Sequence, residues 1–167
     1  ELATTQLLGS LISTPYYQSL RTEAQLGYIV QAFAFNILDT PALGFSVQSD
    51  NTSVGDIVSR TRNFLQDYQG VLADMSEETI AATKLGLIAQ LTEEDKRLGD
   101  TAARYWAEID RRAFDFDTRE RLVSAIEKLG KKELSAYLNQ LLEAQSSVLL
   151  SYSLGNKSEK LTLPDDL

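Results

Sequence analysis

Two neighbouring segments of this chain alternate between bulky and small side chains, and this pattern constrains its fold more than any other feature. In residues 27–37 the bulky positions are Ile29, Phe33, Phe35 and Ile37. Residues 43–48 alternate in the same way. A period of two predicts β-strands. The turn signal Asp39-Thr40-Pro41 between them predicts that the two strands pair antiparallel.

The two faces of this strand pair are expected to meet different neighbours. The bulky side chains would pack against helices; these are Phe33, Phe35, Phe45 and Val47. The other positions would form a smooth second face, made of Tyr28, Ala32, Ala34, Gly44, Ser46 and Gln48. Another backbone or another domain could approach such a face closely.

Helical periodicity dominates the rest of the chain. Apolar residues recur at spacings of three and four over residues 3–13, 57–72, 80–91, 98–113, 122–129 and 134–141. Ser53 and Ser76 are placed as N-caps of the second and third of these helices. Thr14 and Pro15 are a typical cap and first-turn proline, and they predict a separate short helix through Leu20.

A final strand is predicted at residues 147–153, where Val148, Leu150 and Tyr152 share one register. The order is then a helical end, a strand pair, a run of helices and one strand. This order predicts an α+β fold, with a mainly antiparallel sheet and helices packed on one face.

Three strands make a thin sheet for so many helices. We therefore expect further strands to precede Glu1. Residues 1–155 are assigned to a single α+β domain, truncated at its N-terminus, and residues 156–167 to a polar tail.

The chain has no histidine and no cysteine among its 167 residues. It therefore lacks the ligands of nearly every transition-metal site and the usual general base near neutral pH. No nucleophile elbow, phosphate loop or dinucleotide fingerprint is present either. An autonomous enzyme would have to use carboxylates, lysine or tyrosine alone.

Charge and hydropathy narrow the classes of partner. The net charge is −8 and the isoelectric point is about 4.6, so the surface repels phosphate backbones and anionic lipid headgroups. We expect no nucleic-acid partner. The apolar runs are only a few residues long, against roughly 20 for a membrane-spanning helix, and no membrane partner is expected.

Two other features are given structural interpretations. The acidic clusters Glu77-Glu78 and Glu93-Glu94-Asp95 follow the cap-like residues Ser76 and Thr92. They are therefore expected to complement helix dipoles and not to form a catalytic pair or calcium site. Trp106 is expected to be core or domain-contact material and not a stacking platform.

Residues 21–30 read Arg21-Thr-x-x-Gln25-Leu26-Gly27-Tyr28-Ile29-Val30. Taken alone, they predict a helix end followed by a strand. They also closely resemble a signature in the C-terminal half of the pitrilysin and insulin-degrading-enzyme family of zinc peptidases. The resemblance continues, in the family's order, through Val47-Gln48-Ser49, Phe64-Leu65, Met75-Ser76-x-Glu78, Tyr105-Trp106-x-x-Ile109, Phe114 and Phe116.

The resemblance implies a fold and a role. In that family four homologous domains of the LuxS/MPP-like metallopeptidase fold form two halves that close around a chamber, and zinc sits on an H-x-x-E-H helix of the first domain. The chain resembles the last domain, which is non-catalytic and holds no metal. Zinc is expected in the N-terminal catalytic domain of the parent protein. Arg21 is expected to hydrogen-bond the substrate backbone, and Tyr28 to point its hydroxyl at the scissile carbonyl.

The leading hypothesis is therefore a substrate-binding domain of a pitrilysin-like zinc metalloendopeptidase, inactive as an isolated chain. The alternative is a purely structural or assembly subunit of the same fold, and the presence of both Arg21 and Tyr28 favours the first. A third hypothesis, an autonomous hydrolase, has no motif to support it. The expected partners are the zinc-bearing N-terminal half and peptide substrates, and an exposed sheet edge predicts self-association. The expected compartment is the bacterial periplasm.

Overall fold

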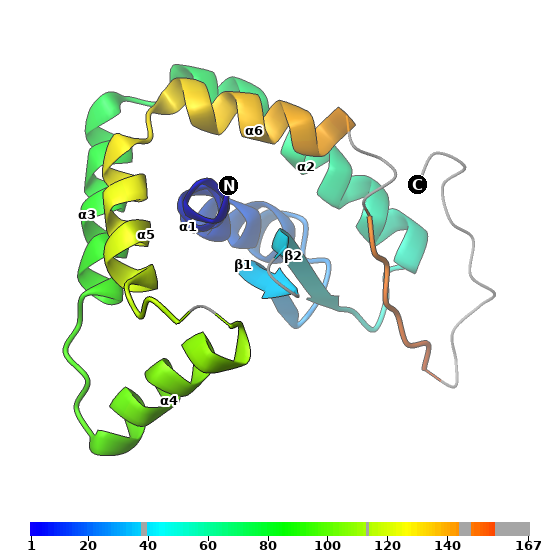
Figure 1. The fold of residues 1–167 in the computed structure, drawn as a ribbon. Coiled ribbons are helices and arrows are strands. Elements are labelled where there is room, and N and C mark those ends of the chain that lie inside the picture. The colour runs from blue at the N-terminus through cyan, green and yellow to red at the C-terminus, as the bar shows by residue number, and fades with distance from the viewer. Residues whose placement is uncertain (38–39, 113, 144–147, 156–167) are drawn as a thin grey trace.

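The computed structural model describes residues 1–37, 40–112, 114–143 and 148–155. Their elements are α1 (Leu2–Tyr16), the π-helix η1 (Tyr17–Glu23), β1 (Ile29–Ile37), β2 (Thr40–Gln48), α2 (Val54–Asp74), α3 (Glu77–Leu91), α4 (Leu98–Asp110), α5 (Thr118–Lys128) and α6 (Lys131–Glu143). The predicted α+β class is confirmed. In Figure 1, α1 is seen nearly end-on, with the strand pair on one side and α2, α3, α5 and α6 around the others.

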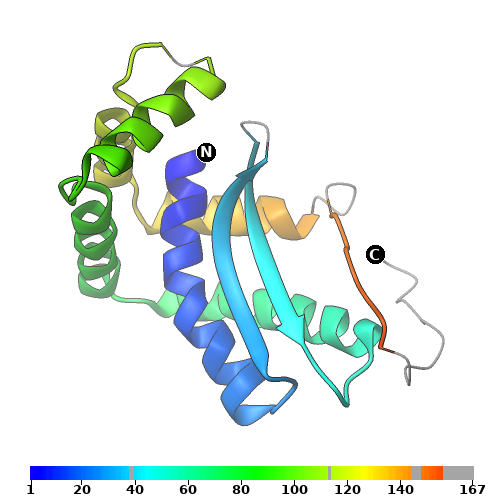
Figure 2. The same cartoon turned by 90° about the horizontal axis from the view of Figure 1, so that it is seen from below.

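The central helix α1 forms the core because it is apolar around most of its circumference. Its side chains Leu7, Leu8 and Ile12 have no solvent exposure. They pack in one cluster with residues of β1, α2, α3 and α6, such as Val30 and Leu134. Figure 2 shows α1 lying alongside β1 for most of the length of the strand.

The strands β1 and β2 pair antiparallel as predicted, but the predicted facing of β1 is wrong. Ala32 pairs with Phe45 and Phe33 pairs with Gly44, and directly paired residues share a face. Ala32 is buried, whereas Phe33 is 43% exposed. The small side chains of β1 therefore meet the helices, together with the bulky ones of β2, while Phe33 and Phe35 point outward.

Close packing of α1 explains this facing. A Cβ atom added at Gly9 of α1 would lie only 3.0 Å from the Cβ of Ala34. A bulky side chain on this face of β1 would force the helix away. On the outer face, a Cβ at Gly44 would lie 2.6 Å from the Phe33 ring, so Gly44 leaves the space that this ring occupies.

The separate short helix predicted from Thr14 and Pro15 is also wrong. Helix α1 continues through Pro15 to Tyr16, and the π-helix follows without a break. Proline has no N–H, so the carbonyl of Leu11, four residues earlier, has no helix donor. The buried hydroxyl of Tyr68 donates to this carbonyl at 2.9 Å. A partner from α2 thus satisfies the group that the proline leaves unbonded.

The predicted N-caps at Ser53 and Ser76 are confirmed, since each hydroxyl accepts from the backbone N–H three residues later. Thr92, in contrast, does not begin a helix. Its hydroxyl and its N–H both donate to Ile88 O at the end of α3. The acids that follow Thr92 therefore lie in a loop, where Asp95 pairs with arginine side chains.

Residues 148–155 form no strand. The strand predicted at 147–153 is wrong for residues 148–153, and Ser147 lies outside the described residues. Alternation alone does not make a strand, because a strand also needs a backbone partner, and within the described part of the chain β1 and β2 pair only with each other.

Several predictions stay open. Asp39, Ala113 and the polar tail 156–167 lie outside the described residues. The expected upstream strands and the self-association through a sheet edge remain predictions.

Candidate functional site

The segment between the π-helix and β1 holds the two residues singled out from the sequence. The π-helix Tyr17–Glu23 carries Arg21 in its last turn, and Tyr28 immediately precedes β1. The π-helix contacts β1. Arg21 and Tyr28 are therefore placed at the same end of the strand pair, on either side of one short loop.

The residues of the loop between the π-helix and β1 each have a structural role. Gln25 adopts the left-handed conformation, with φ of 51°, which ends the helix and reverses the chain. Leu26 is buried in the main core. Its N–H donates to Leu20 O at 2.9 Å, and its carbonyl accepts from the Thr52 hydroxyl at 3.3 Å. The loop is thus anchored to the core at Leu26.

Gly27 lets the loop approach β2 closely. A Cβ atom at this position would lie 2.2 Å from the carbonyl oxygen of Gln48, so no side chain fits. The next residue, Tyr28, donates its N–H to the same oxygen at 2.8 Å. The backbone of Tyr28 is therefore fixed to the end of β2.

The side chains of Arg21 and Tyr28 make no polar contacts within the described residues, although the loop between them is anchored by its backbone. The Tyr28 side chain is 82% exposed. Within the described residues neither side chain has a hydrogen bond or ion pair to another group. A guanidinium and a phenol held in this way present unused donors to a ligand.

A groove lies beside the π-helix, but Arg21 and Tyr28 do not line it. The groove of about 480 Å³ beside the π-helix is lined by Leu20 and Glu23 on one side and by Phe64 and Tyr68 on the other, without Arg21 or Tyr28.

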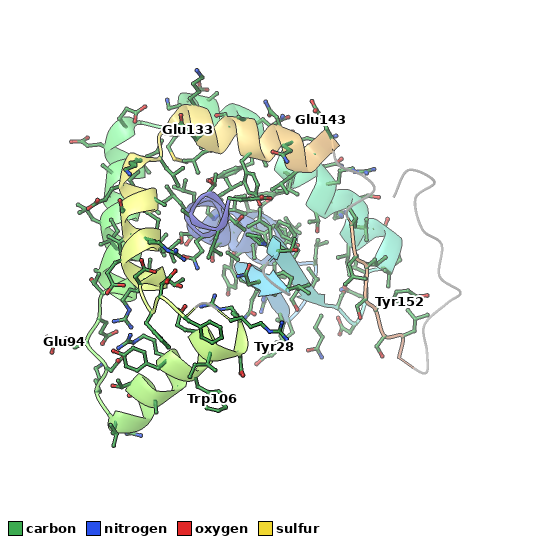
Figure 3. The ribbon with its side chains drawn as sticks, in the orientation of Figure 1. Tyr28, Glu94, Trp106, Glu133, Glu143 and Tyr152 are labelled. Atoms are coloured by element: carbon green, nitrogen blue, oxygen red, sulfur yellow. The ribbon has the colours of Figure 1, made fainter. Side chains whose placement is uncertain are left out.

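Trp106 is 62% exposed on α4 and so is not part of the core of this chain. Figure 3 labels Tyr28 and Trp106, which come close together in that view. Figure 2 shows that the start of β1 and α4 lie at opposite ends of the molecule. Trp106 therefore belongs to a different surface.

A second cluster was not predicted from the sequence. A cavity of about 370 Å³ lies between α3, α4, α5, the N-terminal end of α1 and the far end of β1. Its lining includes Arg104, Arg111 and Arg119. Arg104 lies on α4, Arg111 directly after its end and Arg119 on α5. They form no motif, so their spacing in the sequence gave no signal for them.

The described residues offer no metal site and no membrane-spanning helix. No group of three or more histidine, cysteine, aspartate or glutamate side chains among them could hold a metal ion. Within the same part of the chain, no helix has both the length and the apolar character that crossing a bilayer requires. Among the described residues there is therefore no candidate site for zinc.

Comparison with known proteins finds matches to segments of much longer proteins. A family model described as "PQQ synthase PqqF-like, C-terminal lobe domain 4" matches residues 7–106. Protease 3 of Salmonella typhi is 30% identical over 155 residues, which is 92% of this chain and 16% of that protein. "Insulin-degrading enzyme-like 1, peroxisomal" of Arabidopsis thaliana is 30% identical over 149 residues, 89% of this chain and 15% of that protein.

The structure also matches part of a longer protein. A crystal structure of pitrilysin matches 99% of this chain with a TM-score of 0.84 and 25% identity, and the match covers 18% of that chain. The chain thus spans less than a fifth of the length of the proteins that it matches.

Proposed function

Because this chain belongs to the PqqF-like C-terminal lobe domain family, with pitrilysin-like peptidases among its relatives, we propose that it is a non-catalytic, substrate-binding domain of a zinc metalloendopeptidase of this type. It forms part of the wall of a chamber that encloses a peptide. The zinc-bearing domain is another part of the parent protein, and the chain alone cleaves nothing.

The observation that carries the proposal is the pairing of a fixed backbone with free side chains at Arg21 and Tyr28. Leu26 and the Tyr28 N–H hold the loop to the core and to β2. The side chains have no partner among the described residues that would explain them as fold residues. A purely structural subunit has no need of two such donors at one edge.

The two donors would do different work. The planar guanidinium of Arg21 would hold the substrate backbone by charge-assisted hydrogen bonds, both before and during the reaction. The hydroxyl of Tyr28 would donate to the oxygen that becomes negative in the tetrahedral intermediate. One such donor contributes on the order of 3 kcal/mol to transition-state stabilisation in other enzymes.

A chimaera tests this proposal. Protease 3 of Escherichia coli K12 is 29% identical over 159 residues, 95% of this chain, so its matching segment can be replaced by this chain. Arg21→Ala in an active chimaera should raise KM at least tenfold and also lower kcat, since the lost contact acts before and during the reaction. Arg21→Lys should restore only part of this loss, because a point charge does not replace a planar fork.

Arg60→Ala is the matched control, since Arg60 is exposed on α2 and is not part of the proposed site. It should leave KM within about twofold of the unmutated chimaera. The assembly-subunit alternative predicts instead that Arg21→Ala leaves both kinetic constants unchanged per folded molecule. That result would remove Arg21 from the site.

The bacterial periplasm is the proposed compartment. A chain without cysteine needs no disulfide chemistry in an oxidising compartment, and several of the related Protease 3 sequences come from enteric bacteria. Fractionation of the source cells would test this, and recovery of the protein with the cytosolic fraction would contradict it.

A further inference from the structure

The cavity beside α4 is more cationic than the chain around it. Its three arginines, Arg104, Arg111 and Arg119, face two neighbouring carboxylates, Asp95 and Glu108. Three positive groups against two negative ones leave one positive charge in excess. The whole chain carries a net charge of −8, so this cavity is an exception to the charge of the molecule.

Each arginine keeps donors in reserve. A guanidinium has five N–H groups. Arg104 uses two of them, both on Asp95 at 2.8–3.0 Å. Arg119 makes two long bonds of 3.4 Å, to Glu93 O and Asp95. Arg111 uses two, on Ala107 O and Glu108. Arg104 also lies over the Tyr105 ring, 4.5 Å from its centre. The remaining N–H groups of Arg111 and Arg119 have no hydrogen-bond partner among the described residues.

The Glu108 carboxylate holds the α4–α5 side of the cavity together, and both of its oxygens are used in doing so. Glu108 is only 7% exposed. One of its carboxylate oxygens accepts from Arg111 at 3.0 Å, and the other accepts from the hydroxyl of Thr118. Because both oxygens have hydrogen-bond donors, Glu108 links α4 to α5. The arginines are then the charged groups that could bind a ligand.

One acceptor in the cavity has no donor. The side chain of Gln6 lines the cavity, and its Oε1 atom is buried without a hydrogen-bond partner in the described structure. A buried acceptor of this kind costs roughly 1–3 kcal/mol unless a ligand or water satisfies it. The remaining wall is apolar, with Phe35, Phe116 and Leu122 among its members.

We propose that this cavity binds the C-terminal residue of a peptide that ends in an apolar side chain. The terminal carboxylate takes the free arginine N–H groups, and the N–H of the same residue donates to Gln6 Oε1. The apolar side chain packs against Phe35, Phe116 and Leu122. A volume of about 370 Å³ is at the small end of the range for ligand sites, which suits one residue and not a whole peptide.

This site is separate from the one at Arg21 and Tyr28. Phe35 lies seven residues along β1 from Tyr28, which is about 23 Å in a strand. The cavity itself requires no peptidase activity, so it can be tested on the chain alone.

The test is a calorimetric titration of the full 167-residue chain with acetyl-Ala-Ala-Leu as the free acid and as the C-terminal amide. The free acid should bind, and the amide should bind at least tenfold more weakly, because it carries no charge for the arginines. Arg119→Gln should weaken binding of the free acid at least fivefold. The matched control is Arg121→Gln, two residues further along α5 and paired outside the cavity with Asp115 and Asp117, and it should change affinity less than twofold.

Gln6→Met gives a second readout if Arg119→Gln does not fold. It removes the unpaired acceptor, so unfolding by urea should need the same free energy or more, while affinity for both peptides falls severalfold. Equal binding of acid and amide, no saturable binding, or equal effects of Arg119→Gln and Arg121→Gln would each overturn the proposal. The difference between acid and amide reports the cavity alone, because Arg21 and Tyr28 are proposed to contact the peptide backbone and not its terminal carboxylate. This result and that of the chimaera are therefore independent.

Discussion

The hydroxyl of Tyr68 donates a 2.9 Å hydrogen bond to the carbonyl oxygen of Leu11, the group that Pro15 leaves without a helix donor. This contact joins α2 to α1 six residues before the π-helix begins. It therefore supports the helix that leads directly to Arg21. The contact also lets α1 pass through a proline without ending there.

A double-mutant cycle tests this relationship. Tyr68→Phe should lower the free energy of unfolding by about 1–3 kcal/mol, because it leaves a buried carbonyl unsatisfied. In a Pro15→Ala background the same change should cost clearly less, since the new N–H of residue 15 can bond the Leu11 carbonyl. Urea unfolding of the four proteins gives the coupling. If Tyr68→Phe lowers the free energy of unfolding equally in both backgrounds, the Tyr68 hydroxyl does not replace the missing N–H of Pro15.

Alkaline pH should destabilise the fold through the same residue. Burial raises the pKa of Tyr68 to about 12 and also raises that of Tyr16, whereas an unfolded tyrosine titrates near 10. Between these values the folded chain holds protons that the unfolded chain has lost, so stability falls as pH rises from about 10 to 12. Tyr68→Phe should flatten this fall. Tyr152→Phe, at a half-exposed position, should not change it.

Gly27 should be intolerant of any side chain. Gly27→Ala places a Cβ 2.2 Å from Gln48 O, so the loop must move away from β2 and the Tyr28 N–H must lose or lengthen its bond. We expect a loss of at least 2 kcal/mol, in the range for a backbone clash of this kind. Gly70→Ala, in open space on α2, should instead stabilise by up to about 1 kcal/mol. Thermal unfolding of the two variants makes the comparison, and equal effects would show that the close approach is unimportant.

The elements predicted well are those whose signals are local. The helices after Ser53 and Ser76 combine a side-chain cap with an apolar stripe, and both caps are confirmed. The family resemblance carried by residues 21–30 is confirmed as well. These features depend on residues near one another in the chain, so the sequence displays them directly.

Three of the errors depend on distant partners. Which face of β1 meets the helices is decided by the close approach of Gly9 to Ala34. The continuation of α1 through Pro15 depends on Tyr68, 57 residues away from the carbonyl it bonds. The alternation at residues 148–153 finds no strand to pair with among the described residues. Periodicity in the sequence shows which side chains share a face of a helix or strand. It does not show which other element packs against that face.

In the candidate site, too, only the features with a local sequence signal could be predicted. Residue types at Arg21 and Tyr28 could be matched to a family from the sequence. The left-handed conformation of Gln25 could not, because glutamine is not a typical residue for it. Nor could the cavity at Arg119, whose lining residues come from five elements.

The most direct test of the proposed site is the kcat of the Protease 3 chimaera with Tyr28→Phe, measured together with KM and the melting temperature. Because the change removes a hydroxyl and keeps the ring, kcat should fall roughly 10²–10³-fold with little change in KM. Tyr152→Phe should leave all three values unchanged. If the melting temperature falls and kcat/KM of the folded fraction stays within about threefold, a margin under about 1 kcal/mol, Tyr28 is a fold residue and the proposed role is wrong.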